Sequence, residues 1–311
     1  MRYTLFLFIL LIPQFVRSQD DPNFRQAENL LRNYNPAFNG LEDFDKRSIM
    51  VSFRHQIDKI QGAPLTFAGS YGGHFDKLHG GADISYMFDR IGFQTTSWVG
   101  LKYDAQFKLG KKFDLGFGTR VSSGFVKFDF NSLDPGTPDP DIPTGIQHST
   151  LFPDVDFGMM LTSGKAFFFS LSARHLTQPF ATATAANGYQ WKYGEQYRTY
   201  YAELGGDIKA GEHWQFRYAA DYRMDASTGY GEARAEVHWR FLYASFYCIL
   251  DKWKDDNGNM KYPNPYGFSI GFSRTKGKFH WINSYEPAFD KSPFGSGVES
   301  GMKYVFKKKD E

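Results

Sequence analysis

The chain has one cysteine, no long hydrophobic run and almost no net charge. The single cysteine, Cys248, cannot form an internal disulfide. No internal stretch approaches the roughly 18 apolar residues that a membrane-spanning helix requires. The net charge of +2 creates no strong field for recruiting nucleic acid or an acidic partner. These absences argue against a disulfide-stapled domain, a bundle of membrane helices and a nucleic-acid-binding protein.

Aromatic residues, by contrast, make up 18% of the 311 residues, and they alternate with polar ones. From Trp214 to Met224 every second position is apolar or aromatic, and the positions between include Arg217, Asp221 and Arg223. A period of two places these two sets on opposite faces of a β-strand. Because the pattern recurs through residues 46–306, it predicts an all-β fold, a transmembrane antiparallel β-barrel with lipid outside and a polar lumen inside.

About fourteen alternating segments are long enough for the roughly 9–11 residues with which a tilted strand crosses a bilayer. In one segment the phase set by Phe113 and Phe117 changes near Phe125-Val126, which predicts a β-bulge there. Cys248 belongs to the apolar set of its segment and is expected to face lipid. The expected strand starts lie near Arg47, Ala63, Leu78, Phe93, Lys112, Pro153, Lys165, Gln196, Glu212, Gly229, Arg240, Tyr262, Gly277 and Phe294.

Three other segments flank the predicted barrel at residues 46–306. Residues 1–18 have a basic start, an apolar core and small residues at a cleavage position, which indicates a signal peptide. Residues 19–45 contain turn signals around a short stretch that can form a helix, and we expect this segment on the periplasmic side or in the barrel mouth. Residues 307–311 are expected to form a periplasmic C-terminal tail.

Connection lengths sort by strand parity. Connections after even-numbered segments are short, as at Gly110-Lys111 and Ala210-Gly211, whereas the long connections at 131–152, 177–195 and 251–261 all follow odd-numbered segments. Outer-membrane barrels have short periplasmic turns and longer external loops. If the first strand rises from the periplasm, the long loops lie outside the cell and the C-terminus returns to the periplasm.

Charges of both signs share the face that is expected to line the lumen. A selective pore favours one sign along its path, whereas here acids and bases are interleaved on neighbouring strands and can pair across them. Because unpaired charge in a dry lumen is costly, we interpret the lumen as a braced interior that can hold a polypeptide, in preference to an open pore. Asp154 and Asp156 also fall on this face. The candidate lumen-facing charges are Asp104, Arg120, Arg217, Asp221, Arg223, Glu232, Arg234 and Glu236.

No catalytic, cofactor or metal site is predicted. The eight histidines are scattered over different segments, and none lies in a nucleophile-elbow pattern, so we interpret them as barrel-wall or interfacial residues. The acidic loop at residues 251–259 departs from EF-hand order, because Trp253 occupies a ligand position and no glutamate closes the loop. We interpret this loop as a tight turn, and we expect that the protein is not an enzyme.

Five short elements follow one another along most of the mature chain. They are Gln19-Asp20-Asp21-Pro22-Asn23-Phe24, Asn35-Pro36-Ala37-Phe38-Asn39-Gly40, Gly62-Ala63-Pro64, Pro153-Asp154-Val155-Asp156-Phe157-Gly158 and Leu171-Ser172-Ala173-Arg174-His175-Leu176-Thr177-Gln178-Pro179. In this order they resemble the PorP/SprF family of the type IX secretion and gliding systems of Bacteroidota. Asn-Pro-Ala alone is a weak signal, whereas the ordered set is specific.

The resemblance implies an outer-membrane barrel that helps export a secreted adhesin or anchor it at the cell surface. The implied partners are outer-membrane lipid, the C-terminal region of the secreted protein and periplasmic type IX secretion components. A passive outer-membrane pore or small-molecule transporter is the alternative function. A soluble sandwich is disfavoured, because its aromatic face would form a large exposed patch prone to aggregation. The family has no established catalytic residues to carry over.

Overall fold

The computed structural model describes residues 24, 26–38, 47–57, 62–75, 78, 80–133, 136, 139–164, 166–193, 195–225, 229–249, 253–254, 260–261, 266–276, 279–287 and 296–306. The predicted signal peptide at residues 1–18, residues 251–252 and 255–259 of the predicted turn and the tail at 307–311 lie outside the described residues. Within the described part of the chain, no helix is long and apolar enough to cross a membrane.

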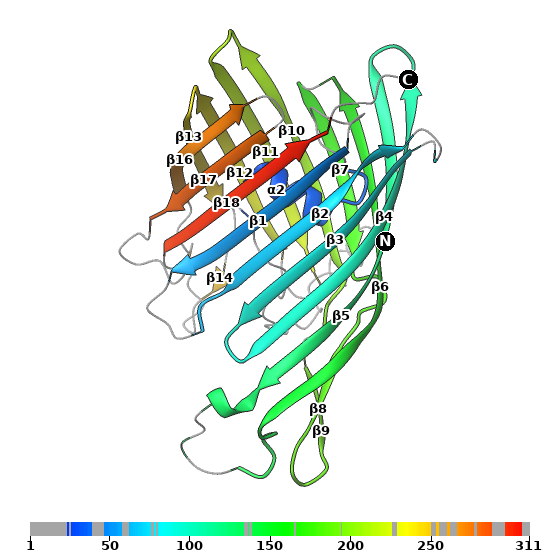
Figure 1. Ribbon diagram of the computed structural model, residues 1–311, viewed down its shortest axis with the longest axis vertical. Helices are drawn as coiled ribbons and strands as arrows, with labels where there is room; N and C mark the ends of the chain where they lie inside the picture. Colours follow the sequence, from blue (N-terminus) through cyan, green and yellow to red (C-terminus); the bar gives the residue numbers. More distant parts are fainter. Residues whose placement is uncertain are drawn as a thin grey trace, which may run out of the picture.

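Fourteen strands of the described chain form one closed antiparallel barrel, which confirms the predicted fold (Figure 1). Barrel neighbours follow chain order, and β1 pairs with β18 to close the cylinder. The barrel strands are β1 (Arg47–Ile57), β2 (Leu65–Phe75), β3 (Gly80–Ile91), β4 (Gln94–Leu109), β5 (Phe113–Asp129), β6 (Ile146–Ser163), β7 (Phe167–Arg174), β10 (Thr199–Ala210), β11 (Trp214–Met224), β12 (Gly229–Trp239), β13 (Leu242–Ile249), β16 (Tyr266–Lys276), β17 (Phe279–Glu286) and β18 (Ser296–Val305).

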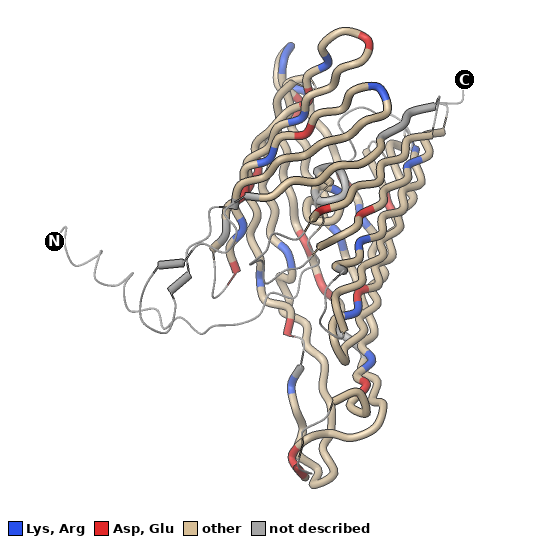
Figure 2. The backbone as a smooth tube through the Cα atoms, turned by 90° about the vertical axis from the view of Figure 1, so that its left-hand side faces the viewer, with Lys and Arg blue, Asp and Glu red and all other residues tan. Residues whose placement is uncertain are grey.

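The alternation in the sequence becomes two faces of one wall. In β11, Trp214, Phe216 and Tyr222 are exposed on the outside, while Arg223 is buried inside. Cys248 is half-buried and shares the phase of the outward residues of β13. Figure 2 shows acidic and basic residues interleaved along the barrel strands. An apolar outer face and a charged inner face suit a cylinder surrounded by lipid.

The irregularity expected in β5 lies in the next strand instead. β5 keeps one phase throughout, so Phe125 is exposed and Phe128 is buried inside the barrel. The register of β5 against β6 shifts between Ser122 and Gly124, where Phe152 and Pro153 of β6 face a single residue of β5. Proline suits a bulge because it has no amide hydrogen for the ladder. The predicted bulge near Phe125-Val126 is therefore wrong: apolar residues simply continue onto the inner face there.

The predicted start of β6 near Pro153 is also wrong. The strand begins at Ile146, seven residues before Pro153, because the bulge lets the ladder continue past the proline. The other barrel strands begin within four residues of the predicted starts. β4, β5 and β6 have 16, 17 and 18 residues, which exceeds the roughly 9–11 residues needed to cross a bilayer.

β5 and β6 extend beyond the other strands at the long-loop end of the barrel (Figure 1). The connections that follow β5 and β7 pack there and form a lobe. The long connections follow β5, β7 and β13, as loop parity predicts, and they contain the helix η2 (Phe130–Ser132) and the hairpins β8 (Ala181–Thr184) with β9 (Gln190–Tyr193) and β14 (Trp253–Lys254) with β15 (Met260–Lys261). β8 packs on the inner face of the β5 extension in a buried apolar cluster. The cluster consists of Trp98, Val126, Phe128, Phe130, Ala181 and Ala183.

Side-chain hydrogen bonds fasten β8 to β6. The Gln147 amide donates to the Thr184 carbonyl at 2.7 Å and accepts from the Thr184 amide at 2.8 Å. The Trp191 indole donates to the Asp141 carbonyl, which joins the β8–β9 hairpin to the loop after β5. The lobe is therefore a folded unit built from two long connections.

Candidate functional site

A segment near the N-terminus lies inside the barrel. Residues 24 and 26–38, hereafter the plug, contain the helix α2 (Ala27–Tyr34), which lies within the ring of strands in Figure 1. The helix ends at Tyr34 because a proline at position 36 disfavours helical dihedrals at Asn35, whose φ and ψ are −116° and 111°. This segment was expected on the periplasmic side or in the barrel mouth. The structure places its described residues inside, against strands on several sides of the barrel.

Asn35 joins the plug to β6 and β7. Its side-chain oxygen accepts a hydrogen bond from the Ala37 amide at 2.8 Å, which forms a tight turn through Pro36. Its side-chain nitrogen donates to Ser170 Oγ at 2.6 Å and to the Met159 carbonyl at 3.1 Å. Asn35 is 1% exposed, so its polar atoms are satisfied by protein groups in the lumen.

Two wall glycines leave room for this turn. Gly118 of β5 and Gly158 of β6 face each other across the ladder. A Cβ atom on Gly158 would overlap Asn35 Oδ1, and one on Gly118 would overlap the Pro36 carbonyl oxygen. The Asn35-Pro36-Ala37 turn therefore rests directly on the barrel backbone, and this close approach requires glycine.

Apolar and aromatic contacts hold the rest of the plug. Leu31, Ala37 and Phe38 pack against Met160 and Phe168 of the wall in one buried cluster. Burying large apolar side chains stabilises the plug by about 1.5–3 kcal/mol each.

Tyr34 extends this packing to β10, the neighbour of β7, and it shares a buried cluster with Ala68 of β2. Its ring stacks on Tyr201 with the centroids 4.7 Å apart, and the Arg174 guanidinium lies 5.2 Å from its ring centroid. The plug is therefore packed into the wall from more than one direction.

Charged wall residues cap the plug backbone. Arg120 donates to the Asn33 carbonyl at 2.7 Å, and Lys102 donates to the Phe38 carbonyl at 2.9 Å. Arg32 reaches outward from the helix to Asp83, with 3.5 Å between nitrogen and oxygen. Hydrogen bonds to charged groups contribute about 1.5–3 kcal/mol each.

The plug also contacts the seam between the first and last strands. Glu299 of β18 lies opposite Arg54 of β1, and the two side chains are 3.3 Å apart. Arg54 also pairs with Glu286 of β17 at 2.8 Å. Gln26 of the plug donates its backbone amide to Glu299 Oε1 at 3.0 Å and its side-chain amide to the Glu299 carbonyl at 3.2 Å. Glu299 of β18 therefore bonds both Arg54 of β1 and Gln26 of the plug.

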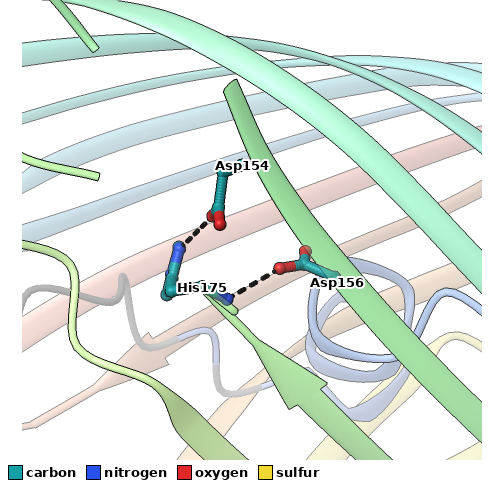
Figure 3. Close-up of side chains that lie close together, drawn as sticks. All are labelled: Asp154, Asp156 and His175. Atoms are coloured by element: carbon teal, nitrogen blue, oxygen red, sulfur yellow. Dashed lines mark hydrogen bonds and ion pairs between the residues drawn. The ribbon is translucent and has the colours of Figure 1, made fainter. Parts of the chain in front are cut away.

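Asp154 and His175 form a buried pair at the end of β7 (Figure 3). His175 has a positive φ of 54° and turns its ring toward Asp154, with Nδ1 2.5 Å from Oδ2. Asp154 Oδ1 accepts from the Thr177 hydroxyl at 2.9 Å and from the Val155 amide at 2.8 Å. Both carboxylate oxygens of Asp154 are therefore in use.

Asp156 gathers three further donors. Its Oδ2 lies 2.6 Å from Arg120 Nη2 and 3.5 Å from Arg174 Nε, and its Oδ1 accepts the His175 amide at 3.0 Å (Figure 3). Since Arg120 also holds the plug carbonyl of Asn33, Asp156 links β5, β6, β7 and the plug.

Asp154, Asp156 and His175 are the one group in the described chain whose three potential ligand atoms lie within 4.8 Å of one another. Every carboxylate oxygen already accepts a hydrogen bond, and Arg120 and Arg174 supply positive charge at the same point. A divalent ion would have to displace those donors and sit beside two guanidinium groups. This chemistry fits a structural lock and does not fit a resident metal.

The structure places all eight candidate lumen charges inside the barrel, and most of them pair with a neighbour. Arg217 lies 3.1 Å from Asp207 and 3.5 Å from Glu236. Asp104 is fully buried, with its Oδ1 3.8 Å from the Lys102 amine. Breaking one partner of such a buried pair costs about 3–5 kcal/mol.

The remaining candidates lie on β11 and β12, on one side of the plug. Arg234 lies 3.0 Å from Asp221 and 3.3 Å from Glu232. Arg223 lies 5.9 Å from the ring centroid of Tyr34 and 5.7 Å from that of Tyr201. Arg223 and Arg120 therefore join the charged wall to the plug.

A cavity of about 230 Å³ lies beside the plug. Trp98, Met87 and Phe93 supply apolar lining, and Arg120 and His175 supply polar lining. Phe93 belongs to the turn between β3 and β4, which lies at the long-loop end of the barrel. The cavity is large enough for a bulky side chain or a short peptide segment.

Sequence reasoning missed His175 and the plug contacts. His175 was interpreted as a wall or interfacial residue, although its position directly after β7, the strand that follows the one with Asp154 and Asp156, was a usable signal. Asn35-Pro36-Ala37 was recognised as a motif, but the groups of β6 and β7 that bond Asn35 are more than a hundred residues away. No local pattern connects positions at that separation.

Comparisons with known proteins agree with this architecture. A family model described as "Type IX secretion system membrane protein PorP/SprF" matches residues 16–287. The CymD monoaromatic hydrocarbon channel has a similar structure, with a TM-score of 0.53 and 9% identity over 92% of this chain and 94% of that one. The toluene transporter TodX of P. putida gives a TM-score of 0.49 and 8% identity, over 89% and 93%. The comparison with curated proteins found no match.

Proposed function

Because this chain belongs to the PorP/SprF family of type IX secretion system membrane proteins, we propose that its barrel binds an exported adhesin and helps to secrete it or anchor it at the cell surface. The chain is an outer-membrane β-barrel, and its family is one of secretion-system barrels, not an enzyme family. Binding and anchoring are therefore the activities that its geometry has to provide.

The occupied lumen is the observation that carries this proposal. The plug rests on Gly118 and Gly158, and Arg120 and Lys102 bond its carbonyl groups. A barrel whose interior is braced by its own N-terminal segment is suited to holding a protein, because its wall is kept rigid while a partner pulls on its loops. A diffusion pore would need this space for water.

The lobe at the long-loop end provides the surface for the client. Gln147 and Trp191 fasten its two connections together, so the surface is organised before a partner arrives. Preorganised loops lose less conformational entropy on binding. Tyr189 at the tip of the β8–β9 hairpin is 61% exposed, and aromatic residues are favoured as binding anchors. We place the C-terminal region of the adhesin here and periplasmic secretion components at the short-turn end.

Affinity purification from native membranes tests this assignment. A C-terminally tagged barrel should carry with it a surface protein and a type IX secretion component. Replacing the β8–β9 hairpin (Ala181–Tyr193) with a short glycine-serine linker should reduce recovery of the surface protein and leave the periplasmic component unchanged. A matched insertion at Gly110-Lys111, in a short turn, should spare the surface protein. Recovery of the bare barrel in every case would contradict the proposal.

The alternative function is a passive pore or small-molecule transporter. It requires a continuous water-filled path, and the plug with its buried ion pairs opposes that. Recording single channels in planar bilayers distinguishes the two functions, because large and stable openings of the wild-type protein would favour the pore.

A further inference from the structure

A second, smaller cavity of about 20 Å³ lies between the plug and strands β7, β10, β11 and β12. Its lining includes Tyr34 and Asn35 from the plug, Ser172 from β7 and Glu203 from β10. A space of this volume accommodates one water molecule or one monatomic ion. It is independent of the lobe that the proposed client-binding function uses.

Two buried oxygen atoms at this cavity have no partner among the described residues. Glu203 is 6% exposed, and its Oε1 makes no hydrogen bond within the described chain. The same is true of the Ser172 hydroxyl, on a residue that is 7% exposed. Leaving a buried carboxylate oxygen unsatisfied costs several kcal/mol, and buried polar groups normally find a partner in protein, water or an ion.

The charge at this place is unbalanced. Glu203 lies opposite Asp221 in the ladder, and Asp221 lies opposite Glu232, so three carboxylates stand side by side across β10, β11 and β12. Arg234 bonds Asp221 and Glu232, and Arg223 is the other guanidinium that lines the cavity. Three acids against two bases leave one negative charge in excess. Like charges in directly opposite positions destabilise a sheet.

We propose that this cavity binds a monovalent cation, with sodium as the ion, through the Glu203 carboxylate and the Ser172 hydroxyl oxygen. One positive charge neutralises the excess. A divalent ion fits poorly, because Glu203, Asp221 and Glu232 do not bring three ligand atoms within 4.8 Å as the Asp154 group does, and Arg234 stands beside them. Since Tyr34 and Asn35 line the same cavity, the bound ion stabilises the plug against β10.

Thermal unfolding of the purified barrel in detergent tests this proposal. Sodium chloride is exchanged for choline chloride at constant ionic strength, which leaves screening unchanged while removing the small cation. At a sodium concentration about five times its dissociation constant, the linkage predicts a Tm roughly 2–4 °C higher than in choline. The shift should saturate with sodium concentration.

Variants separate this site from general salt effects. Glu203→Gln removes the excess charge and should abolish the sodium-dependent shift. Ser172→Ala keeps every charge and should move the midpoint of the shift to higher sodium, which provides the test if Glu203→Gln does not fold. Glu212→Gln, at an exposed residue of a short turn, should behave as the wild type. A Tm that depends on pH but not on sodium would show that a proton neutralises Glu203, and a shift retained in Glu203→Gln would place the ion elsewhere. Either result overturns the proposal.

Discussion

Replacing Gly158 by alanine should dislodge the plug without breaking the barrel. The position is extended strand, so alanine is sterically acceptable to the backbone. The new Cβ would overlap Asn35 Oδ1 and lie 2.9 Å from Pro36 Cδ. The Asn35 side chain cannot keep its position, and it then loses its hydrogen bonds to Ser170 Oγ and to the Met159 carbonyl.

The size of the effect follows from those bonds. Each net hydrogen bond contributes about 0.5–1.5 kcal/mol, so two of them contribute about 1–3 kcal/mol to seating the turn. At 1.4 kcal/mol for each factor of ten, the displaced state of the plug becomes roughly 5- to 150-fold more populated. Displacement exposes the lumen to water and frees the backbone of residues 26–38 to exchange.

Two measurements report this change. Single-channel recording in planar bilayers should show more frequent openings for Gly158→Ala than for the wild type. Hydrogen–deuterium exchange should show lower protection across residues 26–38. Gly116→Ala is the matched control, because it lies two residues from Gly118 on the same inner face and its Cβ would make only ordinary contacts, at 3.5 Å to Gln106 Cγ and 3.7 Å to the Ala37 carbonyl oxygen.

Equal conductance and equal exchange for Gly158→Ala, Gly116→Ala and the wild type would refute the reasoning. That result would mean that the plug does not depend on the glycine niche for its position. A loss of folded protein in Gly158→Ala alone, with Gly116→Ala normal, would instead show that the turn is required for the barrel to form.

Three further substitutions test other parts of the interior. Asp156→Asn leaves Arg120 without its charged partner and should lower the free energy of unfolding by about 3–5 kcal/mol in urea titrations. An unchanged urea midpoint would show that the Asp156–Arg120 pair does not stabilise the barrel. Phe128→Ala should cost about 3–5 kcal/mol through the cavity it leaves in the lobe, with faster protease cleavage in the β8–β9 hairpin as the readout, and cleavage at the wild-type rate would count against the packing. A folded barrel migrates differently from its unfolded chain in gel electrophoresis, and heating converts one band into the other. Arg54→Met should lower the temperature of this conversion, because Glu299 loses its ion pair at the seam. Conversion at the wild-type temperature would show that the β1–β18 ladder alone closes the barrel.

Much of the barrel could be predicted because lipid imposes the same pattern on every strand. The outward set of β11 and the long connections after β5, β7 and β13 follow from periodicity and turn signals alone. The pattern failed where lipid no longer decides the outer and inner faces. In the extension of β5, Phe128 packs under the lobe on the inner face, and an apolar inner residue looks like a change of phase when only the sequence is read.

The candidate site was less predictable, since its contacts are non-local. Inward charges could be identified residue by residue, but which acid meets which base depends on register and on the plug. Arg120 illustrates this: its partners are Asp156 on the next strand and the carbonyl of Asn33, 87 residues earlier in the chain. The sequence around Arg120 does not indicate that a distant segment inside the lumen provides one of its hydrogen-bond acceptors.

The bonds of Glu299 constrain the order in which the molecule can be assembled. Gln26 lies in the first tenth of the sequence, and its acceptor lies 273 residues later, in β18. Contacts at such separation form late and slowly. The hydrogen bonds between Gln26 and Glu299 can therefore form only after β18 has been made, so the plug and the seam between β1 and β18 complete their contacts at the end of assembly.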